Sequence, residues 1–143
     1  MSPQLDDTLD DTLADAHRDA SAATDDGHGA DDRNLVHLRG RVTGAPAHRT
    51  LPSGDEVVGF GLTVTRPDGG VDTLPIQVGP APPAGQRPRA GQVGRRLLGV
   101  AVRAQVGDVL EVEGCLRRRW WEAQGRRVSR IEVVAHRLEV VAR

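Results

Sequence analysis

The chain has 143 residues, 38% of them hydrophobic, which is enough for one domain with a hydrophobic core. No stretch approaches the roughly 18 consecutive apolar residues of a transmembrane helix, and the acidic N-terminus lacks the apolar region of a secretory signal peptide. The single cysteine, Cys115, excludes an internal disulfide, so we expect a cytoplasmic protein in a reducing environment.

The formal net charge of −1 conceals two segments of opposite sign. Residues 1–33 carry ten aspartates and two arginines, a net charge of −8. Residues 34–143 carry seventeen arginines and ten acidic residues, a net charge of +7. This asymmetry predicts an acidic tail on a basic domain that faces a polyanion, with ordinary solvated surface as the alternative.

Residues 1–33 contain no aromatic residue, no valine and no isoleucine, and they are rich in aspartate, alanine and threonine. Such a segment buries too little apolar surface to offset its chain entropy, so we predict a disordered acidic tail. Leu5, Leu9 and Leu13 are spaced four apart and would form one apolar stripe on a helix. A transient helix that docks on a partner is therefore the alternative.

Alternation of apolar and polar residues begins at Asn34 and predicts strands. In the first strand the inward positions are Val36, Leu38, Gly40 and Val42. A turn at 52–55 precedes a second strand, which ends at the turn 67–70; its inward positions are Val58, Phe60, Leu62 and Val64. Residues 71–78 form the hairpin partner of this strand, and Pro75 argues for an edge position there.

The second half of the chain begins with a Pro/Gly-rich surface loop, residues 79–94, and a short helix from about 95 to 105. The next strand places Leu110, Val112, Gly114 and Leu116 inward, and residues 122–125 supply a turn. In the last strand, 126–142, the apolar residues change parity, which predicts a bulge or bend near His136.

Three strands, a helix and two further strands are the element order of an OB-fold, a five-stranded β-barrel with a helix between strands three and four. An immunoglobulin-like sandwich would need about seven strands and no such helix. We therefore predict a mainly all-β chain with a tail at 1–33 and an OB-fold domain at 34–143.

The segments "NLVHLRGRVTGAP", "VVGFGLTVTR", "GDVLEVEGCLRRRWWEAQG" and "SRIEVVAHRLEVV" resemble the bacterial single-stranded-DNA-binding protein (SSB) family, in the same order, over residues 34–141. The resemblance implies an OB-fold that wraps single-stranded DNA (ssDNA), usually as a homotetramer. Where the family often has an edge-strand tryptophan, this chain has Leu74. By motif position the resemblance implies DNA contacts from Arg39, Arg41, Phe60, Arg117, Arg119 and Trp121.

The stretch from Gly114 to Val134 holds both tryptophans of the chain among six arginines. Arginine contacts phosphates and an aromatic ring stacks on a base, so this composition suits a single strand. Trp121 shares strand parity with Arg119, whereas Trp120 either packs inward or binds ssDNA. The alternative is that both indoles cover the barrel end with arginines stacked on them. Phe60 is either core or a stacking residue.

The complete set of candidate ssDNA-binding residues is Arg39, Arg41, Phe60, Arg117, Arg119, Trp120, Trp121, Arg126, Arg127 and Arg130. We predict ssDNA binding without sequence preference, in replication, repair or recombination, by a homo-oligomer that also contacts replication or repair proteins. The alternatives are an OB-fold protein-interaction module with little DNA binding and an RNA-binding domain.

An enzyme, a metal site and a cofactor are not expected. The five histidines are scattered without metal-ligand spacing, and neither a phosphate-binding loop nor a dinucleotide fingerprint is present.

Overall fold

The computed structural model of this protein describes residues 31–143. Within them Leu35–Arg143 form one compact unit. The disordered tail is predicted for residues 1–33, and the leucine stripe lies within it. Residues 1–30 are outside the described residues, so both stay predictions. No helix in the described part of the chain is both long enough and apolar enough to cross a membrane.

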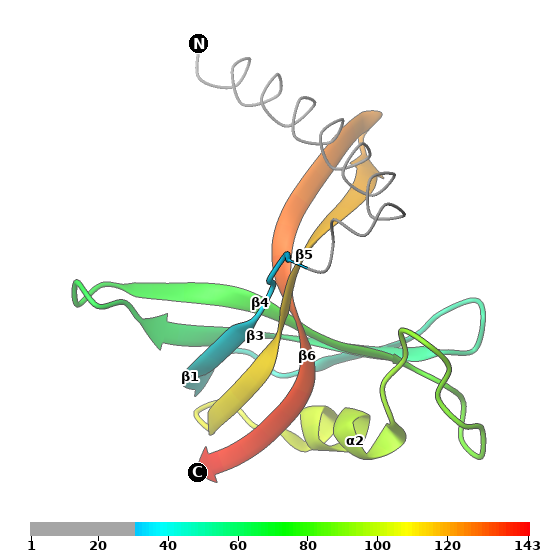
Figure 1. The fold of residues 1–143 in the computed structure, drawn as a ribbon, viewed down its shortest axis with the longest axis horizontal. Helices are drawn as coiled ribbons and strands as arrows, with labels where there is room; N and C mark the ends of the chain where they lie inside the picture. Colours follow the sequence, from blue (N-terminus) through cyan, green and yellow to red (C-terminus); the bar gives the residue numbers. More distant parts are fainter. Residues whose placement is uncertain (1–30) are drawn as a thin grey trace. The chain divides into compact units, whose positions relative to one another are not determined.

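Six strands and one helix follow each other along residues 31–143 (Figure 1). They are β1 (Val36–Val42), β2 (Ala47–Thr50), β3 (Glu56–Thr65), β4 (Val71–Ala81), α2 (Arg95–Arg103), β5 (Val109–Ala123) and β6 (Arg126–Ala142). The helix lies between β4 and β5, as the sequence predicts, and ends two residues earlier than expected.

The strands close into a barrel in the order β1-β5-β6-β4-β3, and a short pairing of β1 with β3 completes the circle. All these pairings are antiparallel except that of β4 with β6. The OB-fold prediction is confirmed, with one addition. Strand β2 pairs with the outer edge of β3 and was not predicted, because all four of its residues are exposed and show no apolar alternation.

Side chains of β1, β3 and β5 at the predicted inward positions, Leu116 excepted, fill the barrel together with side chains of β4 and β6. Leu98 and Ala101 of α2 are 3% and 0% exposed and join this core, so the apolar side of the helix closes one end of the barrel. Removing these side chains from water is the main stabilising term of a domain this small.

Gly40 and Gly114 let strands cross closely where the barrel bends. A Cβ atom built on Gly114 would lie 2.1 Å from the carbonyl oxygen of Val134, and one on Gly40 would lie 2.3 Å from that of Thr63. Both neighbours are backbone atoms, which cannot rotate away as a side chain can. Only glycine therefore fits these two inward positions.

The predicted irregularity near His136 is present as a bulge in β6. Gly114 pairs with Ala135 and Glu113 with Arg137, so His136 is left between the two pairs. The bulge shifts the parity of β6, and Leu138 on the far side is buried again.

Toward the hairpin turn, β5 from Leu116 onward pairs only with β6, and β6 up to Ile131 pairs only with β5; these residues, 116–131, form an arm (Figure 1). The expectation that Leu116 points into the core is wrong: this side chain is 47% exposed, because the core ends where the arm begins. Gln124 and Gly125 both have positive φ and form the two-residue type I′ turn at its tip, tighter than the predicted 122–125 turn.

Strand β4 also differs from its prediction. It runs on to Ala81, so the first three residues of the expected loop 79–94 belong to the sheet. At Pro75 the strand pairs only with β3, and from Ile76 onward it also pairs with β6. The edge position inferred from Pro75 therefore holds up to that residue.

Candidate nucleic-acid interface

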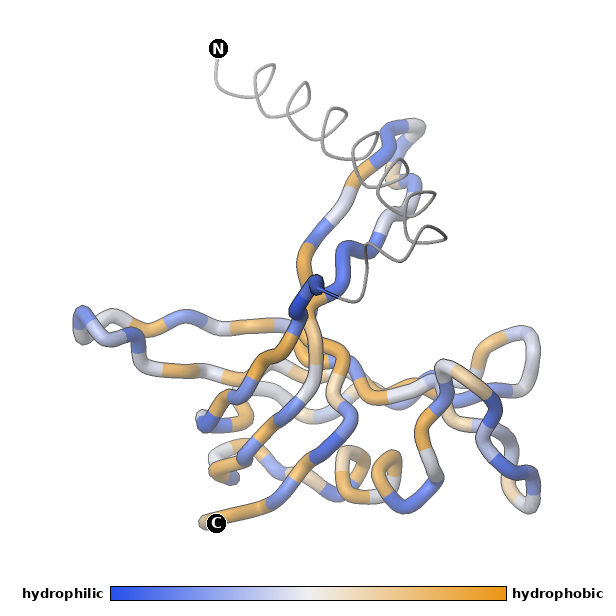
Figure 2. Tube along the Cα trace, in the orientation of Figure 1, coloured by the Kyte–Doolittle hydropathy of each residue, from blue (hydrophilic) through white to orange (hydrophobic). Residues whose placement is uncertain are grey.

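The β5–β6 arm is the most basic element of the described chain. Residues 116–131 contain six arginines and one glutamate, a net charge of +5. Hydrophilic residues predominate toward the tip of the arm, whereas hydrophilic and hydrophobic residues alternate along the strands of the barrel (Figure 2). A positive charge of this size is the kind of feature that attracts polyanions.

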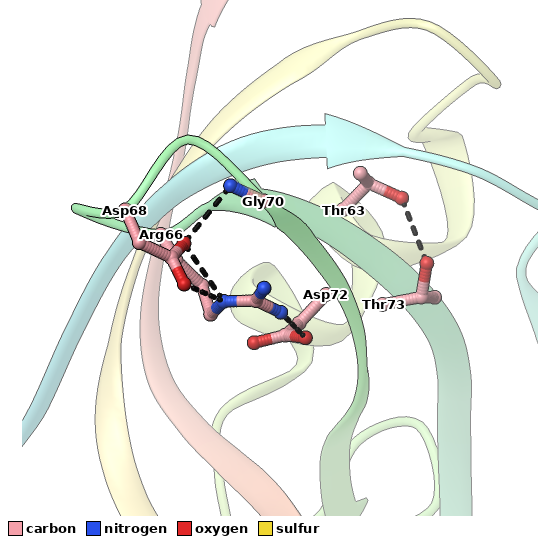
Figure 3. A network of polar contacts seen from close by, with 6 residues as sticks. All are labelled: Thr63, Arg66, Asp68, Gly70, Asp72 and Thr73. Carbon is pink, nitrogen blue, oxygen red and sulfur yellow. Dashed lines mark hydrogen bonds and ion pairs between the residues drawn. The ribbon is translucent and has the colours of Figure 1, made fainter.

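The β3–β4 hairpin offers no comparable charge. At its tip the Arg66 guanidinium donates to Asp68 at 3.1 Å and to Asp72 at 2.7 Å, and the hydroxyls of Thr63 and Thr73 lie 3.0 Å apart behind it (Figure 3). These hydrogen bonds raise the pKa of Arg66, and the backbone N–H of Gly70 lowers the pKa of Asp68 further than Arg66 does. Two acids against one arginine leave residues 63–73 of this hairpin with a net charge of −1.

Both tryptophans of the arm have guanidinium groups over their rings. The guanidinium carbon of Arg119 lies 5.4 Å from the ring centre of Trp121, which is 38% exposed. Trp120 is half-buried, with Arg127 at 4.3 Å and Arg118 at 5.6 Å from its ring. The alternative in which arginines stack on the indoles therefore describes the geometry, while Trp121 keeps a large accessible surface.

A groove of about 740 Å³ runs between the arm and the barrel wall, within the range of roughly 300–1,000 Å³ typical of ligand sites. Strand β2 supplies one rim, the outward positions of β3 and β4 form the floor, and the arm forms the other rim. The side chains that line it include Arg49, Thr73, Pro75, Gln77, Arg119, Arg130, Ile131 and Glu132.

The groove brings together only some of the predicted site residues. Arg119 and Arg130 face each other across the β5–β6 pairing and line it. Phe60 contributes to its wall but is 7% exposed and packs in the barrel core. Three others, Arg117, Arg126 and Arg127, lie on the same arm and are exposed.

Arg39 and Arg41 of β1 are not among the residues that line this groove. Arg39 donates to Glu111 at 2.9 Å and 3.2 Å, beside His37, whose Nε2 lies 3.1 Å from the same carboxylate. The Arg39 hydrogen bond, with a smaller contribution from His37, lowers the pKa of Glu111. Arg41 donates to the carbonyl of Gly107 at 3.3 Å.

Two groove residues escaped the sequence analysis. The sequence does not single out Arg49, because the strand that carries it is exposed on both faces. Glu132 looks like an ordinary polar residue of an alternating strand, yet it is 2% exposed. No periodicity could have identified either, since a sequence pattern does not show which strands lie beside the groove.

No metal-ligand cluster of three or more histidine, cysteine or acidic side chains occurs within residues 31–143.

Comparison with known proteins finds a likeness in structure alone. No family model matches the chain, and no curated protein matches it. Among solved structures, the N-terminal domain of the PriB protein from Thermoanaerobacter tencongensis, described as dimeric, is similar with a TM-score of 0.53. The match covers 78% of this chain and 100% of that domain at 23% sequence identity. This likeness supports the OB-fold; membership of the SSB family remains a prediction.

Proposed function

We propose that this protein binds ssDNA as a non-enzymatic OB-fold protein, with the strand lying along the groove and the β5–β6 arm. The observation that carries the proposal is the position of the exposed Trp121 beside Arg119, on an arm of net charge +5 that borders the groove. Arg49 stands on the opposite rim, so phosphates can be held from both sides.

A single strand offers phosphates and unpaired bases, and this surface has side chains suited to both. Phosphate contacts from arginines release counterions and so weaken with added salt. A base that stacks on an exposed indole contributes about 1–3 kcal/mol and tolerates any sequence. Roles in replication, repair or recombination are part of the proposal, and so are contacts with proteins of those pathways.

Anisotropy of a labelled oligo-dT tests the proposal. We expect binding at low salt that weakens as salt rises, and a loss of about five- to 150-fold in affinity for Trp121→Ala, the equivalent of one stacked base. Val71→Ala is the matched control, because Val71 is an exposed apolar residue on the acidic β3–β4 hairpin. Absence of binding at low salt would overturn the proposal in favour of a protein-interaction module.

We also propose a homodimer formed along β1. This strand pairs with β5 over Val36–Arg41 but with β3 only at Arg41 and Val42. Within the described residues, one edge of Val36–Gly40 therefore has no neighbouring strand, and such an edge favours pairing with a second copy. The PriB domain is described as dimeric, which agrees with this proposal; the expected tetramer stays a prediction.

A further inference from the structure

Glu132 is a buried carboxyl group without a full set of partners. It is 2% exposed although the neighbouring Ile131 is 43% exposed. Its Oε1 atom is buried and has no hydrogen-bond partner among the described residues. Burying a carboxyl group is unfavourable unless its oxygens are hydrogen-bonded, so this unfilled acceptor needs a physical explanation.

The nearest cation does not fill this acceptor. Arg130 Nη2 lies 3.6 Å from the other oxygen, Oε2, which is an ion pair but too long for a hydrogen bond. Asp55 also has a buried unpartnered oxygen, but it is not among the residues that line the groove. Glu132 is thus the buried acceptor within the groove where we place ssDNA.

The surroundings of Glu132 suit a base better than a phosphate. Arg49, Arg119 and Arg130 lie at the rims, where a phosphate backbone is attracted. Pro75 and Ile131 also line the groove and add apolar surface, which suits the flat face of a base better than a phosphate. Glu132 itself repels a phosphate, so the inner wall of the groove favours the base.

A carboxylate accepts hydrogen bonds and donates none. Cytosine, adenine and guanine carry an exocyclic amino group that can donate to it, as cytosine N4 does to acidic side chains in DNA complexes. Thymine has no amino group, and its one N–H lies between two carbonyl oxygens that a carboxylate repels.

We propose that Glu132 accepts a hydrogen bond from the amino group of one bound base, so that the groove favours amino-bearing bases over thymine at that position. This inference rests on the proposed ssDNA binding and refines the expectation of binding without sequence preference. Stacking and phosphate contacts act along the whole strand, whereas this discrimination acts at one nucleotide.

The test compares labelled oligo-dC and oligo-dT of equal length by anisotropy, because both are pyrimidines. For the native protein we expect oligo-dC to bind at least about fivefold more tightly. In Glu132→Gln the ratio should fall toward one, since an amide both donates and accepts. Glu122→Gln is the matched control: it removes the same charge from an exposed position on the same arm and should leave the ratio unchanged.

A modified oligonucleotide tests the same idea without altering the protein. Oligo-dC with two methyl groups on N4 has no amino donor and should bind about as weakly as oligo-dT. Equal native affinity for oligo-dC and oligo-dT, or a preference that persists in Glu132→Gln or with the methylated strand, would overturn the role of Glu132. Failure to bind any oligonucleotide would instead overturn the proposed function.

Discussion

The arginines of this protein differ in the groups that they already contact. Arg39 and Arg66 are hydrogen-bonded to carboxylates, so a phosphate must compete with an acid for either of them. Arg119 and Arg127 lie over indole rings, a contact that does not use up the N–H donors of a guanidinium group as an ion pair with a carboxylate does. The second kind is better suited to contact a phosphate while an indole stacks on a base. The contacts of each arginine, more than the number of arginines, therefore distinguish the proposed binding surface.

The carboxyl group of Glu56 allows a test of how the stability of the protein depends on pH. Hydrogen bonds from Arg95 first, and His48 second, lower the pKa of Glu56 below its usual 4.5. A carboxyl group whose pKa is lower in the folded state stabilises the protein above the unfolded pKa and loses that effect as pH falls through the folded pKa. We expect the melting temperature of the native protein to fall more steeply than that of Glu56→Gln between about pH 5 and about pH 3.

A second carboxyl group, that of Glu122, provides the control for Glu56→Gln. Glu122→Gln removes a carboxyl group from the arm, far along the chain from the Arg95 contact, and should follow the native curve. Parallel pH curves for the native protein and Glu56→Gln would contradict the assignment. The link matters structurally, because Arg95 begins α2 and also donates to the carbonyl of Pro82 at 2.9 Å.

The crossing of β5 and β6 can be tested at the level of the strand pair. Gly114→Ala places a methyl group against the backbone of Val134 and Ala135, and we expect a loss of about 1–3 kcal/mol in the free energy of unfolding. Gly44→Ala is the control, since nothing lies within 4 Å of its added Cβ, and chemical denaturation measures both. Equal stability of the two variants would show that the strands separate without cost.

The elements that the sequence predicts well are those with a buried face. The alternation of Val58, Phe60 and Leu62 identifies β3 because one side of that strand meets the core. The bulge at His136 was predictable for the same reason, since a parity change forces an irregularity. Strand β2 and the outward position of Leu116 were not predictable, because neither has a core neighbour to impose a pattern.

The candidate site was predictable only in part. The basic-aromatic composition of 114–134 singles out the arm from sequence alone. The groove, however, also needs residues of β2, β3 and β4, and the pairing of distant strands determines which of them face it. Arg49 and Glu132 could therefore be assigned only from the folded chain, as could the separation of Arg39 from the groove.

The proposed pairing of two copies along β1 can be tested through the oligomeric state of the protein. If two copies pair along β1, sedimentation should give a mass that rises with concentration toward twice the 15.3 kDa of one chain. Leu35→Asp should favour the monomer, because a charge beside an unpaired strand edge opposes pairing, and Leu35 is 80% exposed and outside the core. Val106→Asp, at a 61% exposed loop position, is the control. A monomer at every concentration would refute the dimer.

The β5–β6 arm consists of the type I′ turn and two strand segments that pair only with each other. The arm adds little to the barrel's hydrophobic interior, so exchanging its side chains is inexpensive for folding. Substitutions on the arm can therefore change the surface that it offers to a ligand while the barrel that carries it stays folded.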